Sequence, residues 1–137
     1  MLQRNRTPSW EGTSLRLPRG REYDPYAHAA ALGLQVVIGD IPEPEVWLPD
    51  SFTIVLNASL RPAQQREVCA HGVAHAALGH EDDRPKHENQ ADLYSSLYLI
   101  HPAELRDARR GTDDLGRIST ELGLTQQLIE VYLRWAS

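Results

Sequence analysis

The chain has 137 residues, of which 41% are hydrophobic, so it can bury the core of one domain without disulfide support. Its single cysteine, Cys69, excludes a disulfide framework within the chain and fits a reducing compartment. The net charge of -5 argues against nucleic acid as the main partner. The N-terminus lacks the apolar core of a secretory signal, and no apolar stretch is long enough to cross a bilayer. The composition therefore predicts a cytoplasmic protein with no membrane partner.

The chain is expected to divide into a tail and one domain. Residues 1–22 carry five arginines against two glutamates, with scattered proline and glycine and no periodic apolar pattern. This composition predicts a basic extended tail. The remainder, 23–137, is predicted to be a single domain that ends in a short helical hairpin at about 114–137.

The first half of the domain combines a short helix with strands. Asp24 is a good N-cap, Pro25 suits the first helical position, and Gly33 suits the end of a helix. Runs of β-branched residues after this helix predict strands. The expected elements are a helix over 25–32, strands over 34–38 and 51–57, and either a loop or an irregular edge strand over the proline-rich segment 41–50.

Helices fill the second half. Pro62 opens a helix that Gly79 stops, Pro102 opens a shorter one, and Thr125 caps the last. The predicted helices cover 62–78, 86–99, a short segment from 102, and the C-terminal segment from 125. Together these elements predict a small, helix-rich α+β domain with a minimal sheet.

Two histidines carry the first chemical signal. His71 and His75 are four residues apart on the helix that begins at Pro62. Residues at this spacing stack on one helix face, with Cβ atoms about 5–6 Å apart, so both imidazoles can turn a nitrogen toward one metal ion. Zinc binds histidine nitrogens in this way at about 2.0–2.1 Å. The pair therefore predicts two ligands of a Zn²⁺ cofactor, and a pair of unrelated helix histidines is the alternative until a third ligand is identified.

A third ligand is expected from the next helix. Glu88 follows His75 by thirteen residues, and the turn between the two helices would bring it back toward the pair. His80 and His87 are competing candidates. His80 lies at the helix end, where an interaction with the helix dipole is expected, and His87 points about 100° away from Glu88. Glu88 is therefore preferred.

Five short motifs follow one another in the order of a known family: Asp24-Pro25-Tyr26-Ala27, Leu32-Gly33-Leu34, Thr53-Ile54-Val55-Leu56-Asn57, the stretch from Ala70-His71 to His80, and Glu88 to Asp92. On these motifs, residues 24–105 resemble the ImmA/IrrE family of zinc metallo-endopeptidases. The resemblance implies a zincin-like fold, in which a small sheet packs on the active-site helix and C-terminal helices follow. It also implies zinc ligation by His71, His75 and Glu88.

One position departs from the family. Its helix motif is H-E-x-x-H, and Gly72 occupies the position of the glutamate, which serves as general base and then acid, a role worth about 10²–10⁴-fold in rate. Glycine has no side chain for this role and costs roughly 1 kcal/mol against alanine in a helix interior. The nearby acidic residues do not occupy the required position; they are Glu67, Glu81, Asp82 and Asp83. An engineered knock-out, a natural pseudoenzyme and a base from elsewhere in the chain are the three explanations, and natural loss is preferred.

The resemblance implies a partner and a reaction. Members of the family cleave repressors of the helix-turn-helix type, and so short a chain suits a stand-alone phage or mobile-element protein. Peptidase activity should be severely impaired or absent because of Gly72, and Gly72→Glu would recover cleavage if only the base is missing. The alternative is a non-catalytic module that holds a peptide or repressor without cutting it.

Two further residues or segments are expected to support the site. Asp92 lies four residues after Glu88, shares its helix face, and is predicted to orient a ligand histidine without binding the metal itself. The strand over 51–57 is predicted to offer an exposed edge along which a peptide substrate could pair.

The C-terminal hairpin allows a third interpretation. Residues 119–127 resemble a helix-turn-helix, with Gly123 in the turn and Thr125 as the cap. A DNA-binding protein normally presents a basic face, but over residues 118–137 Glu121 and Glu130 outnumber Arg134. The hairpin is therefore interpreted as packing structure, and direct binding of DNA is the least favoured function.

Overall fold

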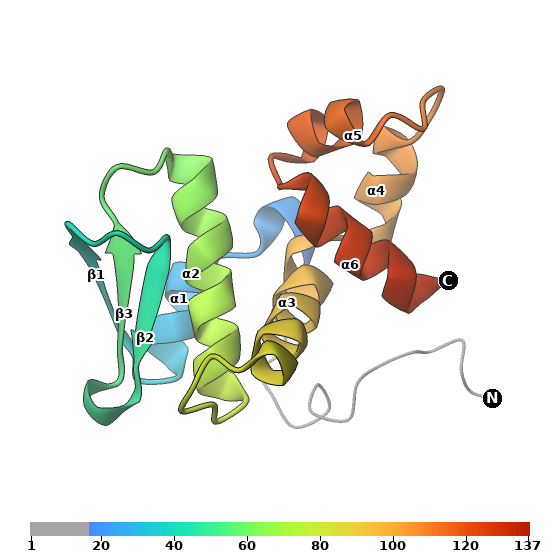
Figure 1. Ribbon diagram of the computed structural model, residues 1–137. Coiled ribbons are helices and arrows are strands. Elements are labelled where there is room, and N and C mark those ends of the chain that lie inside the picture. The colour runs from blue at the N-terminus through green and yellow to red at the C-terminus, as the bar shows by residue number, and fades with distance from the viewer. Residues whose placement is uncertain (1–16) are drawn as a thin grey trace.

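The computed structural model describes residues 17–137. Its central helix, α2, has a three-stranded sheet on one side and α3, followed by the C-terminal helices, on the other (Figure 1). The α+β architecture agrees with the sequence prediction, and the helix boundaries that proline and glycine predicted are within one residue of those observed. The elements are α1 (Pro25–Ala31), β1 (Gln35–Gly39), β2 (Glu45–Leu48), β3 (Thr53–Asn57), α2 (Pro62–Ala77), α3 (Pro85–Leu99), α4 (Pro102–Ala108), α5 (Leu115–Leu122) and α6 (Gln126–Ala136), with 3-10 turns at Gly20–Glu22 and Pro49–Ser51.

The sheet has the order β1-β3-β2, so the last strand in the sequence lies in the middle. β1 runs parallel to β3, and β2 runs antiparallel to it. The proline-rich segment 41–50 therefore contains an edge strand, as one of the two sequence alternatives proposed. The expectation that the strand over 51–57 offers a free edge is wrong, because β3 is hydrogen-bonded to β1 on one side and to β2 on the other. An extended peptide could pair only with an outer strand.

The first described residues pack against the helices. Arg19 donates a hydrogen bond to the carbonyl of Ile100 at 3.1 Å, and the backbone N–H of Arg21 donates to Glu104 at 3.0 Å. Leu17 contacts the main hydrophobic core. Residues 17–22 of the predicted tail are thus joined to the domain, and residues 1–16 lie outside the described part of the chain.

The C-terminal hairpin is part of the core. Leu128, Ile129 and Tyr132 on α6 are buried in the main cluster, and α6 packs on α3. Thr125 accepts a hydrogen bond from the N–H of Leu128 and donates one from its own hydroxyl to Glu67 on α2 at 2.6 Å. The capping signal predicted from the sequence therefore also fixes the start of α6 to α2.

Across residues 17–137, the structure contains no helix with the length and apolar character that crossing a membrane requires.

Candidate metal centre

Helix α2 carries the two predicted histidines side by side. Pro62 begins the helix, and the backbone N–H of Arg61 just before it donates to the Gln64 side chain at 3.1 Å. Two turns further on, the rings of His71 and His75 have centroids 4.7 Å apart and meet edge to face. The i, i+4 spacing thus places both imidazoles on one face of α2, as the sequence predicted.

The end of α2 supplies a partner for His75. Gly79 has a φ of +72°, which lets the N–H of His80 bond the carbonyl of His75 at 2.9 Å and close a Schellman motif. The chain thereby turns back, and His80 Nδ1 lies 2.9 Å from His75 Nδ1. Trp47 donates to the carbonyl of His80 at 2.9 Å, and Gln90 holds its other ring nitrogen at 2.8 Å. His80 is therefore placed to orient His75, a contact that sequence reasoning missed.

Helix α3 brings the predicted third ligand to the pair. The Glu88 carboxylate lies between the two rings, with Oε1 3.2 Å from His71 Nε2 and Oε2 3.1 Å from His75 Nε2. Its neighbour His87 instead turns to Asp82, at 2.6 Å. Of the competing candidates, Glu88 is thus the one whose side chain faces the Nε2 atoms of both histidines.

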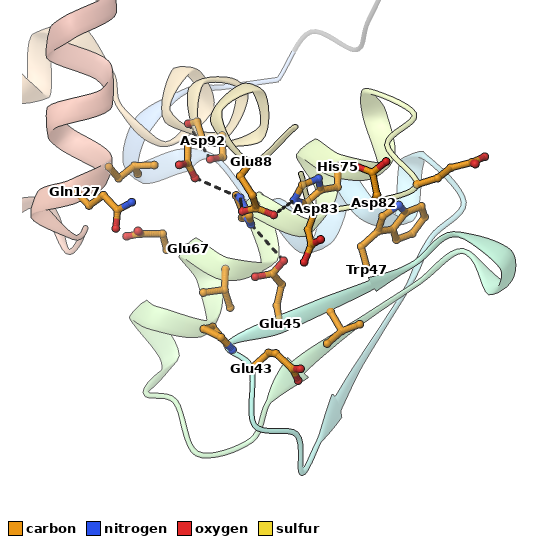
Figure 2. Close-up of a pocket in the computed structure, with 17 residues that line it drawn as sticks. Glu43, Glu45, Trp47, Glu67, His75, Asp82, Asp83, Glu88, Asp92 and Gln127 are labelled. Atoms are coloured by element: carbon orange, nitrogen blue, oxygen red, sulfur yellow. Dashed lines mark hydrogen bonds and ion pairs between the residues drawn. The ribbon is translucent and has the colours of Figure 1, made fainter. Parts of the chain in front are cut away.

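Two more carboxylates reach His71, from opposite sides. Asp92 on α3 places Oδ1 3.2 Å from His71 Nε2, and Glu45 on β2 places Oε2 3.2 Å from His71 Nδ1. Figure 2 shows Glu45 approaching from the sheet and Glu88 and Asp92 approaching from α3. The sequence carried no signal for Glu45, because only the pairing of β2 with β3 brings it beside α2. The predicted contact of Asp92 with one of the two histidines is present, at Nε2 of His71.

The surroundings of the two histidines shift their pKa values in opposite directions. Burial alone would lower the pKa of His71, but Asp92 and Glu45 outweigh it and raise that pKa to about 10. Burial, aided by the neighbouring His71, lowers the pKa of His75 to about 4. Burial also raises the pKa of Glu88. The site therefore favours one positive charge among its carboxylates.

These groups suit a divalent metal ion. Within the described residues, His71 Nε2 is buried and meets no partner with hydrogen-bond geometry, although two carboxylates lie 3.2 Å away. Imidazole nitrogens together with carboxylate oxygens are donor atoms that zinc accepts. Glu45, His71 and His75 also offer ligand atoms within 4.8 Å of one another, so Glu45 is a candidate ligand beside Glu88. The residues present therefore fit a metal ion.

Position 72 faces the sheet. A Cβ atom built on Gly72 would lie 2.7 Å from Cγ2 of Ile54 on β3, closer than real Cβ contacts allow. Ile54 is fully buried and β-branched, so its side chain has little freedom to move aside. The sequence suggested only that glycine weakens the helix. The structure shows that it also allows α2 to approach β3 closely.

His71 and His75 line an acidic cleft with a volume of about 620 Å³. Among the described residues that line it, eight are acidic and none is lysine or arginine. The acidic residues are Glu43, Glu45, Glu67, Glu81, Asp82, Asp83, Glu88 and Asp92 (Figure 2). The cleft therefore favours positively charged groups.

A family model described as the IrrE N-terminal-like domain, of a peptidase family, matches residues 29–134. The match covers β1 to β3, α2 with both histidines, α3 with Glu88, and nearly all of α6. Searches of curated proteins and of solved structures found no match.

Proposed function

The chain belongs to the family of IrrE N-terminal-like domains, a peptidase family, and from this we propose that it is a zinc-binding member with severely impaired hydrolysis. His71, His75 and Glu88 hold the metal. The observation that carries the proposal is the position of the Glu88 carboxylate, which lies 3.2 and 3.1 Å from the Nε2 atoms of the two histidines. This arrangement joins α2 and α3 at one point.

The surrounding residues support ligation through Nε2. Glu45 holds Nδ1 of His71, and His80 holds Nδ1 of His75. Such outer contacts fix the ring orientation and the tautomer of a ligand histidine. When bound at such a site, zinc supplies Lewis acidity toward a peptide carbonyl.

The impairment follows from the missing carboxylate. No side chain extends from Gly72, and two of the four acidic residues near it in sequence have other partners: Glu67 accepts from Thr125, and Asp82 accepts from Arg84 and His87. Loss of a general base reduces a rate by about 10²–10⁴-fold. The close contact between Gly72 and Ile54 supports natural loss, because the space beside the glycine is filled rather than left as a cavity. The same contact favours a second candidate function, a module that binds its partner without cutting it.

Metal analysis tests this proposal. Purified protein supplied with zinc should hold about one zinc per chain, and His71→Ala should hold much less, because the two histidines bind the ion together. The matched control is His101→Asn, which changes a histidine outside the cleft and keeps an N-cap for α4. Elemental analysis measures the zinc content per chain of the wild type and the two variants. Wild-type protein without zinc would contradict metal binding and leave the binding-module function.

The partner we propose is a protein with a cationic segment, such as a helix-turn-helix repressor. Proteins that bind DNA present clustered lysine and arginine to the phosphates. The acidic residues of the cleft are complementary to such a surface. The same charge disfavours the direct binding of DNA by the cleft.

Peptide binding tests the proposed partner chemistry. A fluorescent arginine-rich peptide should bind, and binding should weaken as salt rises, because the attraction is partly between exposed charges. Glu43→Gln combined with Asp83→Asn should weaken it further, whereas the control Glu130→Gln, on the exposed side of α6, should not. Anisotropy titrations provide the measurement, with a glutamate-rich peptide and a DNA duplex as comparisons. Equal affinity for the acidic peptide, or tighter binding of the duplex, would count against a cationic partner.

A further inference from the structure

We infer that Asp92 is a fourth metal ligand, so that His71, His75, Glu88 and Asp92 close the metal site with protein side chains. The inference rests on the proposed metal binding and concerns the type of site that results. A catalytic zinc site usually has three protein ligands and an open position, whereas a structural site has four.

The two carboxylates of α3 converge on one nitrogen. Glu88 and Asp92 are four residues apart, so they share one face of the helix. Glu88 Oε1 and Asp92 Oδ1 each lie 3.2 Å from His71 Nε2. Two carboxylates that face the same nitrogen are both stabilised by a positive charge placed beside it. A cation bound at Nε2 would satisfy both carboxylates.

The separations match those of ligands around one ion. Four atoms bound tetrahedrally at about 2.0–2.1 Å lie about 3.3 Å from one another. The contacts of His71 Nε2 with Glu88 and Asp92 are both 3.2 Å, and the contact of His75 Nε2 with Glu88 is 3.1 Å. The two contacts of His71 Nε2 therefore have the length expected between ligands of one ion, and Glu88 reaches His71 with Oε1 and His75 with Oε2.

The other nitrogen of each ring already has a partner. Glu45 contacts His71 Nδ1, and His80 contacts His75 Nδ1. Orientation of the two ligand rings is therefore provided by residues other than Asp92. Glu45 contacts Nδ1 of His71, whereas Asp92 contacts Nε2, the nitrogen that Glu88 also faces.

A closed site changes what the metal does. With four protein ligands, no position is left for water or a peptide carbonyl, and the ion fastens α2 to α3. Such a site has no use for a general base, which agrees with glycine at position 72. The protein then binds its partner through the acidic cleft, and the ion stabilises the packing of α2 against α3.

Cobalt substitution tests whether the site is closed. Protein loaded with Co²⁺ is titrated with azide, and the visible absorption reports whether azide enters the coordination sphere. The wild-type spectrum should not change, because four side chains occupy the ion. Asp92→Ala should bind cobalt more than about tenfold more weakly and show a saturable change with azide. Asp107→Ala, a matched aspartate change on α4, should behave like the wild type.

The outcomes distinguish failure of the closed site from failure of the proposed metal binding. Cobalt bound to wild-type protein whose spectrum shifts with azide would overturn the closed site and leave the proposed metal binding intact, whatever the variants do. An azide response in Glu45→Gln but not in Asp92→Ala would overturn Asp92 as the ligand. Wild-type protein that takes up no cobalt would overturn the proposed metal binding itself.

Discussion

Gly72→Glu should destabilise the protein by about 3 kcal/mol or more and should not restore hydrolysis. Its Cβ would lie 2.7 Å from Cγ2 of the fully buried Ile54, and added atoms in a filled core cost about 1–3 kcal/mol. A carboxylate buried without a partner costs more. Denaturant unfolding of the variant and the wild type measures the difference. This expectation replaces the one from sequence alone, in which the glutamate would simply return to its place.

Three further variants test this explanation. Gly72→Ala should also be destabilised, although alanine favours a helix by about 1 kcal/mol over glycine. Gly116→Ala, the matched change in α5, should cost less, because its Cβ would meet only side-chain ends, the nearest being Asp114 Oδ1 at 3.2 Å. Ile54→Ala combined with Gly72→Ala should cost less than the sum of the two single changes. A stable Gly72→Glu protein that cleaves a repressor would show that the sheet can yield at this point.

Zinc should raise the free energy of unfolding by about 4 kcal/mol when free zinc is 1,000 times the dissociation constant. The stabilisation is expected because the ligands come from two helices: His71 and His75 lie on α2, and Glu88 lies on α3. Unfolding separates these groups and loses the ion. Thermal unfolding with zinc, and again after a chelator is added, measures the effect.

The matched variant for this experiment is His75→Ala, which removes one proposed ligand. Its unfolding temperature should respond little to zinc or to the chelator, whereas His101→Asn should respond like the wild type. A wild-type protein whose stability is unaffected by zinc would contradict a metal that joins α2 and α3.

The sequence by itself determined the features that depend on local chain geometry. Pro62 is the first residue of α2, Gly79 follows its last residue by two positions, and Thr125 caps α6, because proline, glycine and threonine act on the backbone beside them. The spacing of His71 and His75 fixed their common face for the same reason. Glu88 could be chosen because only a short turn separates its helix from the histidines.

The tertiary structure decided what depends on residues far apart in the chain. The central position of β3 results from pairing with β1 and β2 together, and no single strand sequence specifies its neighbours. Glu45 reaches His71 only because β2 lies at the edge of that sheet, beside α2. Gly72 acquires its role only from Ile54 across the core. Such contacts form when helix and sheet pack together, so the requirement for glycine at position 72 cannot be read from the helix sequence alone.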